Sequence, residues 1–588
     1  MSKIKEYLVK FLLVEEIISA LFLTVVIMYF LGGKFSGSFL IEFLLFIAFF
    51  VLIRTGIKSF SKRRLKYSLW FAVPISIAFW FGHKVINGSV EIREINLFDI
   101  PVVIALIIIF ILMSIVVLSY LDKKQFSFKK VPSFTKNKWF KYSLIIFICW
   151  LPLFLAFFPG IVSSDNGVQI SQVIGDREWS NWHPVISTAF IGLPITIGMN
   201  VFGDLTAGIA LATLIQMILL ALIFGYVAEW IMSRVSSKKW IGYAFLLFFA
   251  LCPVIASYSI VLWKDVMFSA LFMLLVLKIY ELISNIGREQ QLQMKSVVCI
   301  FILAVLVAFF RNGGVLILAT FAIAMIIYFK QSRKELAVVS VISIAFILIV
   351  QGPIYKVLNI ASSPFMESMS VPAQQIGYVV SKDGLSEEEK TALSKFADIE
   401  KLKNNYSPMN ADPAKNSFNY DVVNDDKVGF LRVWFDILKN HFGSFVRSYI
   451  LQMYSYWYPD KTETWVIDFE HTHDSRWLQR EYTDVSLIGE KTPSLFEKIE
   501  LWLMHSTWLG WMASVGVLCW GITYMVVVFL YQKKYYMMVP VSLVLVYIIS
   551  LLIASPVSWI FRYVYSLLLI MPLLVLFSFV KIRKKENK

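Results

Sequence analysis

Runs of apolar residues long enough to cross a lipid bilayer recur along the whole chain. Most are close to the roughly 20 residues that an α-helix needs to span the hydrocarbon layer. Hydrocarbon offers no hydrogen-bond partners, so each segment must satisfy its own backbone, as an α-helix does. A membrane β-barrel is disfavoured because its strands alternate apolar and polar residues, whereas these runs are continuous. The sequence therefore predicts an all-α polytopic membrane protein.

The first run begins close to the N-terminus and is not followed by a small-residue cleavage site, so it is interpreted as an uncleaved span rather than a signal peptide. The candidate spans lie at roughly 8–31, 38–54, 67–83, 98–121, 139–158, 184–201, 205–232, 240–257, 262–282, 296–310, 313–329, 336–355, 508–530, 536–554 and 560–580.

The net charge of +15 comes from lysines and arginines that cluster in short loops between the apolar runs. Such loops are typical of the cytoplasmic side of a membrane protein, so the charge does not indicate nucleic-acid binding. If every candidate crossed, the two basic ends would lie on opposite sides. The segment 184–201, in and around which two prolines and two glycines occur, is the one expected not to cross fully, as a re-entrant or interfacial helix. We therefore expect about 14 spans, with both termini cytoplasmic, in the cell membrane.

The stretch from about 356 to 505 is much too long for a connector and is expected to fold as an extracytoplasmic insertion of mixed secondary structure. The expected organisation is then N-terminal transmembrane helices of unclear role (1–125), a transmembrane core (126–355) with an outer loop at 159–183, the insertion (356–505) and C-terminal transmembrane helices (506–588).

Three cations fall on the predicted outer side, close to the membrane surface: Lys264, Arg311 and Arg562. The positive-inside rule gives no reason for them, and ionisable groups at the membrane edge commonly mark functional sites. The simpler alternative is that they snorkel to the surface or pair locally, as Lys264 would with Asp265. Asp265 is also counted as a secondary acid. The outer loop that carries Asp165 is predicted on the same side, so we expect these groups to converge.

Asp165 follows a Pro-Gly turn and two serines in "PGIVSSD", residues 159–165. Such a turn lets the backbone bend tightly and approach a ligand. One carboxylate beside several cations suits a transfer reaction from a lipid phosphate: cations stabilise the leaving phosphate, and the carboxylate takes the proton of the attacking hydroxyl. The alternative is that Asp165 caps the helix predicted over "NGVQISQVIG".

Other polar residues give weaker signals. Asp176 and Glu178 are candidate second acids or metal ligands, or simply solvated loop residues; His183 is a candidate phosphate or substrate contact, or a turn histidine. The stretch "DFEHTHDSRW" (468–477) holds residue types that bind metals, but its spacing matches no recognised ligand pattern. No metal ligand is therefore predicted, and a divalent cation stays an open option. Nucleotide hydrolysis and serine or zinc hydrolysis lose support because the P-loop, G-x-S-x-G and H-E-x-x-H motifs are absent from the sequence.

Two stretches of the chain resemble the GT-C superfamily of membrane glycosyltransferases: "FFPGIVSSDNGVQ" (157–169) and "WHPVISTAFIGL" (182–193). More narrowly, the chain is similar to a GT-C-like group of multi-spanning proteins from Gram-positive bacteria. This second resemblance rests on "PGIVSSD" together with "ESMSVPAQQ" (367–375), "SPMNADPAK" (407–415) and "SPVSWIFRY" (555–563). Together the stretches cover roughly residues 150–588.

The resemblance implies a GT-C-type inverting glycosyltransferase of the cell envelope. Its donor would be a polyprenyl-phosphate sugar, and its acceptor an extracytoplasmic glycopolymer, glycolipid or protein. Asp165 matches the catalytic loop carboxylate, and Arg562, Arg311 and Lys264 would hold the donor phosphate. The expected substrate contacts are His183, Glu367, Gln374, Gln375 and Tyr563, although the two glutamines would equally suit a turn cap. Many GT-C enzymes carry paired acids where this chain has one aspartate, flanked by Ser164 and Asn166.

Two other classes of function stay open at this point. A secondary transporter or a flippase of lipid-linked glycans would be expected to show charges at the bilayer midplane and inverted repeats, and neither is evident. A non-catalytic membrane scaffold would use the 356–505 insertion to bind a partner, and Asp165 and the outer cations would then have no reason to converge.

Overall fold

The computed structural model describes residues 2–30, 39–85, 95–129, 134–235, 238–286, 292–459, 482–483, 485–506 and 508–581. These residues fold into helices joined by short turns, and they contain isolated β-bridges but no strands. The chain forms two compact units, which are described separately. Unit 1 is made of Met1–Phe126, Thr523–Tyr535 and Val575–Lys581, and unit 2 is made of the remainder.

Unit 1 holds the four N-terminal helices. Apolar residues of the first, second and fourth helices form its core, and the third helix packs against the fourth. The buried charges Lys84 and Asp99 pair at 2.6 Å between the third and fourth helices. The four helices are α1 (Ser2–Phe30), α2 (Phe39–Lys58), α3 (Lys62–Lys84) and α4 (Asp99–Lys123). The unit also includes the second half of α27 (Val515–Tyr531) and the end of α29 (Tyr565–Phe579).

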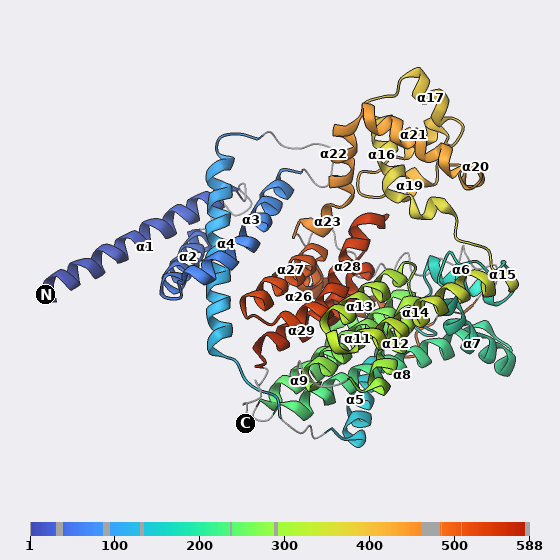
Figure 1. Ribbon diagram of the computed structural model, residues 1–588, viewed down its shortest axis with the longest axis horizontal. Helices are drawn as coiled ribbons and strands as arrows, with labels where there is room; N and C mark the ends of the chain where they lie inside the picture. The colour runs from blue at the N-terminus through green and yellow to red at the C-terminus, as the bar shows by residue number, and fades with distance from the viewer. Residues whose placement is uncertain are drawn as a thin grey trace. The chain divides into compact units, whose positions relative to one another are not determined.

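Unit 2 holds the apolar helices that position the candidate site. Helix α5 packs on α8, α8 packs on α7, and α13 packs on α28 (Figure 1). The helices are α5 (Lys136–Ala156), α6 (Ser164–Val173), α7 (Val185–Phe202), α8 (Leu205–Arg234), α9 (Lys239–Leu251), α10 (Pro253–Ser259), α11 (Lys264–Ile286), α12 (Met294–Phe309), α13 (Gly314–Tyr328), α14 (Arg333–Ile349), α15 (Tyr355–Val357), α25 (Thr492–Ser506), α26 (Trp508–Met512), α28 (Met538–Ala554) and the first part of α29.

Each apolar segment singled out in the sequence is helical, which confirms the all-α polytopic prediction. Eleven helices in the described residues are long and apolar enough to cross a membrane, and α9 with α10, bent by 53° at Cys252–Pro253, gives a twelfth if the pair is one span. Three further apolar helices, α12, α13 and α27, have only 15 to 17 residues. The expected count of about 14 spans is therefore larger than the number that meets the length requirement.

Helix α7 corrects the argument for a re-entrant segment. Pro194 and Gly192 lie within a continuous helix of 18 residues, long enough to cross, which ends where Gly203 adopts a positive φ of 73°. Proline removes only one backbone donor, and a helix that packs along α8 tolerates that loss. The prolines therefore do not break this segment, and that basis for its re-entrant assignment is wrong.

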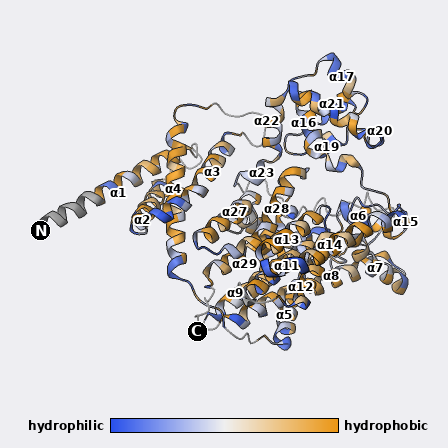
Figure 2. Ribbon diagram, in the orientation of Figure 1, coloured by the Kyte–Doolittle hydropathy of each residue, from blue (hydrophilic) through white to orange (hydrophobic). Residues whose placement is uncertain are grey.

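The insertion is helical rather than mixed, because in its described residues strand pairing is limited to isolated bridges such as Ala397 with Phe418. Its buried apolar residues form a core of their own, which includes Ile376, Leu402 and Phe430. In Figure 2 its helices alternate hydrophilic and hydrophobic residues, whereas α11 to α14 are mostly hydrophobic. The helices are α16 (Ser370–Lys382), α17 (Glu387–Leu393), α18 (Ile399–Asn405), α19 (Asp412–Lys415), α20 (Tyr420–Asp425), α21 (Lys427–Asn440), α22 (Phe442–Gln452) and α23 (Tyr454–Trp457).

The insertion is bonded to the connection between α28 and α29. The amide of Ala411 donates to the Pro556 carbonyl at 2.9 Å, and Asn410 forms a β-bridge with Val557. At the end of α22, Gln452 donates to the Ser555 carbonyl at 3.0 Å. Two of the motif stretches noted in the sequence, 407–415 and 555–563, therefore meet where the chain enters α29.

Candidate functional site

The Pro159–Gly160 turn places the chain after α5 against neighbouring backbone. Gly160 has a φ of 122°, and a Cβ added to it would lie 2.3 Å from Thr213 Oγ1, so glycine is required for both conformation and space. The next residue, Ile161, donates its amide to the Ile260 carbonyl at 2.9 Å and pairs with Val261. The turn therefore fixes the start of α6 beside the segment that leads into α11.

The start of α6 is closed by a capping box. Ser163 is the N-cap, and its amide donates to Asn166 Oδ1 at 3.2 Å. Asn166 also donates to the Leu262 carbonyl at 2.8 Å, and the Trp263 indole donates to Ser163 Oγ at 2.5 Å. The alternative that Asp165 caps this helix is therefore wrong, because Ser163 and Asn166 do so and leave the aspartate side chain free for other partners.

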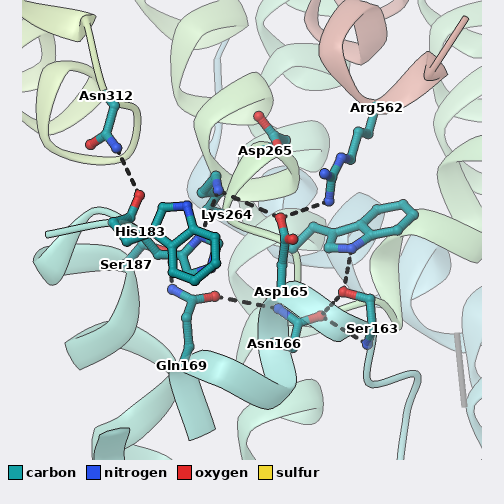
Figure 3. Close-up of polar contacts among 12 residues, drawn as sticks. Ser163, Asp165, Asn166, Gln169, His183, Ser187, Lys264, Asp265, Asn312 and Arg562 are labelled. Carbon is teal, nitrogen blue, oxygen red and sulfur yellow. Dashed lines mark hydrogen bonds and ion pairs between the residues drawn. The ribbon is translucent and has the colours of Figure 1, made fainter. Parts of the chain in front are cut away.

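Two cations from distant parts of the chain meet at the Asp165 carboxylate. Arg562 Nη1 donates to Asp165 Oδ2 at 2.8 Å, and Lys264 Nζ lies 3.6 Å from the same oxygen (Figure 3). The three side chains keep 25% (Asp165), 19% (Lys264) and 15% (Arg562) of their exposure, so the cluster is largely buried yet still reachable. The predicted convergence of these three residues is therefore present in the structure.

His183 joins the cluster through Lys264. Its Nδ1 lies 2.9 Å from Lys264 Nζ, so the neutral ring accepts from the ammonium. Trp182 stacks on the imidazole with ring centres 5.5 Å apart, and the Asn312 amide donates to the Trp182 carbonyl at 2.9 Å. His183, predicted as a phosphate or substrate contact, thus lies beside the candidate site and orients one of its cations.

Arg311 binds a different carboxylate from the other two cations. Its guanidinium donates to Asp265, which is only 1% exposed, and it lies over the ring of Tyr563 at 5.5 Å and that of Tyr547 at 5.0 Å. The proposed local pairing of Lys264 with Asp265 is therefore wrong. Tyr563 also lies 5.2 Å from the Arg562 guanidinium, so one ring separates the two arginines.

The surrounding charges set the protonation states of Asp165 and His183. Burial by itself would raise the pKa of Asp165, but the charges of Arg562 and Lys264 outweigh it and hold that pKa well below its usual range. Burial, followed by the nearby Lys264 ammonium, lowers the pKa of His183 to about 3. Near neutral pH the cluster thus holds an ionised aspartate and a neutral imidazole.

Glu367, Gln374 and Gln375 lie inside the insertion. Glu367 accepts from Lys415 at 2.7 Å, which ties together the stretches 367–375 and 407–415. Gln374 donates to the Pro408 carbonyl at 3.0 Å, and Gln375 accepts from the Trp434 indole at 3.1 Å. In the described residues their bonds stay within the insertion, so the structure does not bring them to Asp165, and their substrate contact stays a prediction.

The secondary acids are divided between two places. Asp265 follows Lys264 in the chain and pairs with Arg311 beside the cluster, whereas Asp176 and Glu178 lie on the turn after α6 and do not take part in the ion pairs of Asp165. No group of three or more candidate metal ligands occurs among the described residues. The stretch 468–477, considered as a metal cluster in the sequence, lies outside them.

Several residues that hold the site escaped sequence reasoning. Asn166, Trp263, Asn312 and Tyr547 form its frame, and Gln216 supports it by donating to the Ser259 and Val261 carbonyls. The S-x-x-N spacing of Ser163 and Asn166 is a weak capping signal. The other contacts depend on tertiary packing, which no local pattern encodes.

Comparisons with known proteins assign the chain to a family but give no activity. The family described as "Family of unknown function (DUF6020)" matches residues 176–588, which include Lys264, Arg311 and Arg562 but not Asp165. No curated protein and no solved structure matches the chain.

Proposed function

The chain belongs to the DUF6020 family, and we propose that it is a membrane glycosyltransferase that moves a sugar from a polyprenyl-phosphate donor to an extracytoplasmic acceptor hydroxyl. One observation carries the proposal: Arg562 and Lys264, almost 300 residues apart, both point at one oxygen of Asp165. The resemblance to GT-C enzymes in the same stretches agrees with it.

The cations give the site affinity for a phosphate. Arginine and lysine bind phosphate oxygens through charge-assisted hydrogen bonds, each worth about 1.5–3 kcal/mol. A donor phosphate placed at Arg562 and Lys264 competes with Asp165 for them. The phosphate therefore takes over the partners that the carboxylate holds at rest.

This exchange also explains how a strongly acidic aspartate serves as a base. While both cations hold it, Asp165 has a lowered pKa and is a weak proton acceptor. Once a phosphate neutralises the cations, the pKa of the carboxylate returns toward its usual value. Donor binding thereby prepares the base for the acceptor hydroxyl.

The reaction balances with these groups alone. The acceptor oxygen attacks the anomeric carbon as the bond from that carbon to the phosphate oxygen breaks. The bonding electrons leave with the phosphate, giving polyprenyl phosphate, while Lys264 and Arg562 stabilise the growing charge. The acceptor proton passes to Asp165. Attack from the face opposite the phosphate inverts the anomeric configuration.

The test is a transfer assay with purified protein in lipid nanodiscs. A panel of radiolabelled polyprenyl-phosphate sugars is incubated with cell-envelope acceptors, and product is separated from donor. We expect consumption of one donor that depends on added acceptor and is inhibited by polyprenyl phosphate. Intact donor throughout the panel, with every acceptor, would overturn the proposal.

A second candidate function is favoured by the break between α9 and α10. Broken helices bent within the membrane are common at the binding sites of transporters, and here the pair bends by 53°. The buried Glu500 accepts from Ser257 on α10 at 2.7 Å. Movement of labelled lipid-linked sugar across a proteoliposome membrane, without its consumption, would support transport in place of transfer.

A further inference from the structure

Two buried polar atoms, one in the Asp165 cluster and one in the neighbouring pair of Arg311 and Asp265, have no hydrogen-bond partner in the described part of the protein. They are Asp265 Oδ2 and Arg562 Nε. Asp265 uses its other oxygen for Arg311, and Arg562 uses its terminal nitrogens for Asp165 and, at 3.5 Å, the Tyr563 hydroxyl. Buried polar groups are nearly always paired, so two orphans in one candidate site point to a ligand group that completes them.

The two residues are linked through Arg311 and the Tyr563 ring. Asp265 interacts electrostatically with the Arg562 guanidinium, and the Tyr563 ring contacts both Arg562 and Arg311, the partner of Asp265. Figure 3 draws the side chains of Asp265 and Arg562 above the Asp165 carboxylate, with a dashed contact from Arg562 to Asp165. Asp265 and Arg562 thus contribute one unpaired acceptor and one unpaired donor to the surroundings of the same tyrosine ring.

The two orphans differ in chemistry, and this selects the ligand group. Arg562 Nε–H can only donate, and a carboxylate oxygen such as Asp265 Oδ2, whose partner oxygen accepts from Arg311, can only accept. A phosphate oxygen would satisfy the arginine but would be repelled by the carboxylate. A hydroxyl group accepts from one and donates to the other without adding charge. Beside them, Trp263 and Tyr563 are only partly buried and place flat rings 5.3 and 5.2 Å from the Arg562 guanidinium.

We propose that Asp265 Oδ2 and Arg562 Nε form a subsite that binds one hydroxyl of the transferred sugar, with Trp263 and Tyr563 alongside its ring. The subsite rests on the proposed glycosyl transfer and adds a specificity determinant to it. Arg562 then has two roles on separate nitrogens, with Nη1 directed to the phosphate or Asp165 and Nε directed to the sugar.

The experiment pairs changes in the protein with changes in the sugar. The probes are short-chain polyprenyl-phosphate glucose, galactose and mannose and the monodeoxy analogues of each. Wild type should transfer one parent sugar and one of its monodeoxy analogues with kcat/KM values that differ about 10- to 100-fold, as expected for a lost hydrogen bond to charged groups. The variant Asp265→Asn/Arg311→Gln removes both charges of a buried pair, so that neither is left uncompensated.

In that double variant the kcat/KM for the parent sugar should fall to the value for the sensitive deoxy analogue. The enzyme should then no longer discriminate between the two sugars. Arg562→Lys keeps a cation for the phosphate but lacks Nε, so this variant should also lose the discrimination between the two sugars. It provides the test if the double variant does not fold. Glu281→Gln, on the same helix α11 but remote from the site, should discriminate as wild type does.

The outcomes separate the two proposals. If a parent sugar is transferred but the variants keep the wild-type preference, or if wild type treats all monodeoxy analogues alike, the subsite is overturned and the transfer activity stands. If wild type transfers no donor and binds no member of the panel more tightly than it binds the sugar-free polyprenyl phosphate, both proposals fail.

Discussion

Helix α11 carries a charged cluster near each end, and the two clusters are built differently. Toward its end, both oxygens of Glu281 are occupied: Arg234 at 2.5 Å and the Trp230 indole at 2.9 Å bind one, and Lys278 at 2.9 Å binds the other. At its start, Asp265 keeps one oxygen without a partner. The same helix thus presents one saturated cluster and one unsaturated cluster.

The comparison teaches how to separate an anchor from a site. The Glu281 cluster joins α8 to α11 and includes an ion pair three residues apart on one helix, so its role is fully accounted for by packing. The Asp165 cluster gathers side chains from α6, α11 and the short helical turn before α29, and a donor in it and an acceptor of the neighbouring Asp265 stay unpaired. Partly satisfied buried networks are costly, and a ligand is the simplest way to complete one.

The largest expected effect is that of Asp165→Asn. The amide keeps the shape of the side chain but accepts no proton, so kcat for transfer should fall about a hundredfold to ten-thousandfold. Wild-type amounts of folded protein, measured by gel filtration in detergent, would show that the loss is chemical. Activity above half that of wild type would show that Asp165 is not the base. It would also contradict the functional distinction between the two clusters.

Lys264→Met should have the next largest effect on transfer. It keeps the length of the side chain but removes one charge-assisted bond to phosphate, so kcat/KM for the donor should fall about 10- to 100-fold. The matched change at the other end of α11 is Lys278→Met, which should leave donor kinetics unaltered. An equal fall in kcat/KM in both variants would mean that the Lys264 charge acts by stabilising the fold rather than by binding the donor.

His183 gives the site a signature in the pH dependence of stability. Its pKa is about 3 in the fold against an ordinary 6.5, so between these values the unfolded chain binds more protons and stability is lost as the pH falls. The loss is at most about 1.4 kcal/mol per pH unit. His183→Gln should lack this component. Between about pH 7 and pH 4.5 its thermal midpoint should therefore fall less steeply with decreasing pH than that of wild type. The same dependence of the thermal midpoint on pH in both proteins would contradict the claim that His183 is buried as a neutral imidazole.

Glu281→Gln should have the smallest effect on transfer and a visible effect on stability. Loss of the charge leaves Arg234 and Lys278 without their carboxylate, which should cost about 1–3 kcal/mol and lower the thermal midpoint. Transfer by the protein that remains folded should change less than about twofold. A large loss of kcat with an unchanged midpoint would show that the saturated cluster also takes part in function.

The fold was largely predictable because its main signal is local. Hydropathy over about 20 residues identifies a membrane helix without knowledge of its neighbours, and each apolar segment is helical. The expected span count exceeds the eleven or twelve helices that are long enough because α12, α13 and α27 are shorter, and the argument from proline failed in α7, where Pro194 does not interrupt the helix.

The site was predictable only as a set of residues on one face. Sidedness predicts that Lys264, Arg311 and Arg562 converge on Asp165, since the segments that carry them are expected on the same side. In the structure Lys264 and Arg562 do so, whereas Arg311 pairs with Asp265. The choice of partners could not be predicted, because the pairing of Arg311 with Asp265 and the capping of α6 by Ser163 depend on packing between segments distant in sequence. The same limit applies to Gln374, whose motif gave no sign that it would be buried within the insertion.

The central claim is that the unsaturated cluster binds a lipid phosphate, and equilibrium binding of short-chain polyprenyl phosphate tests it most directly. Purified wild type, Arg562→Gln and Glu281→Gln are compared in nanodiscs that lack other phosphate-bearing lipids. We expect Kd to rise about 10- to 100-fold in Arg562→Gln and to stay at the wild-type value in Glu281→Gln. Equal affinities in all three proteins, or no binding to wild type, would contradict the account.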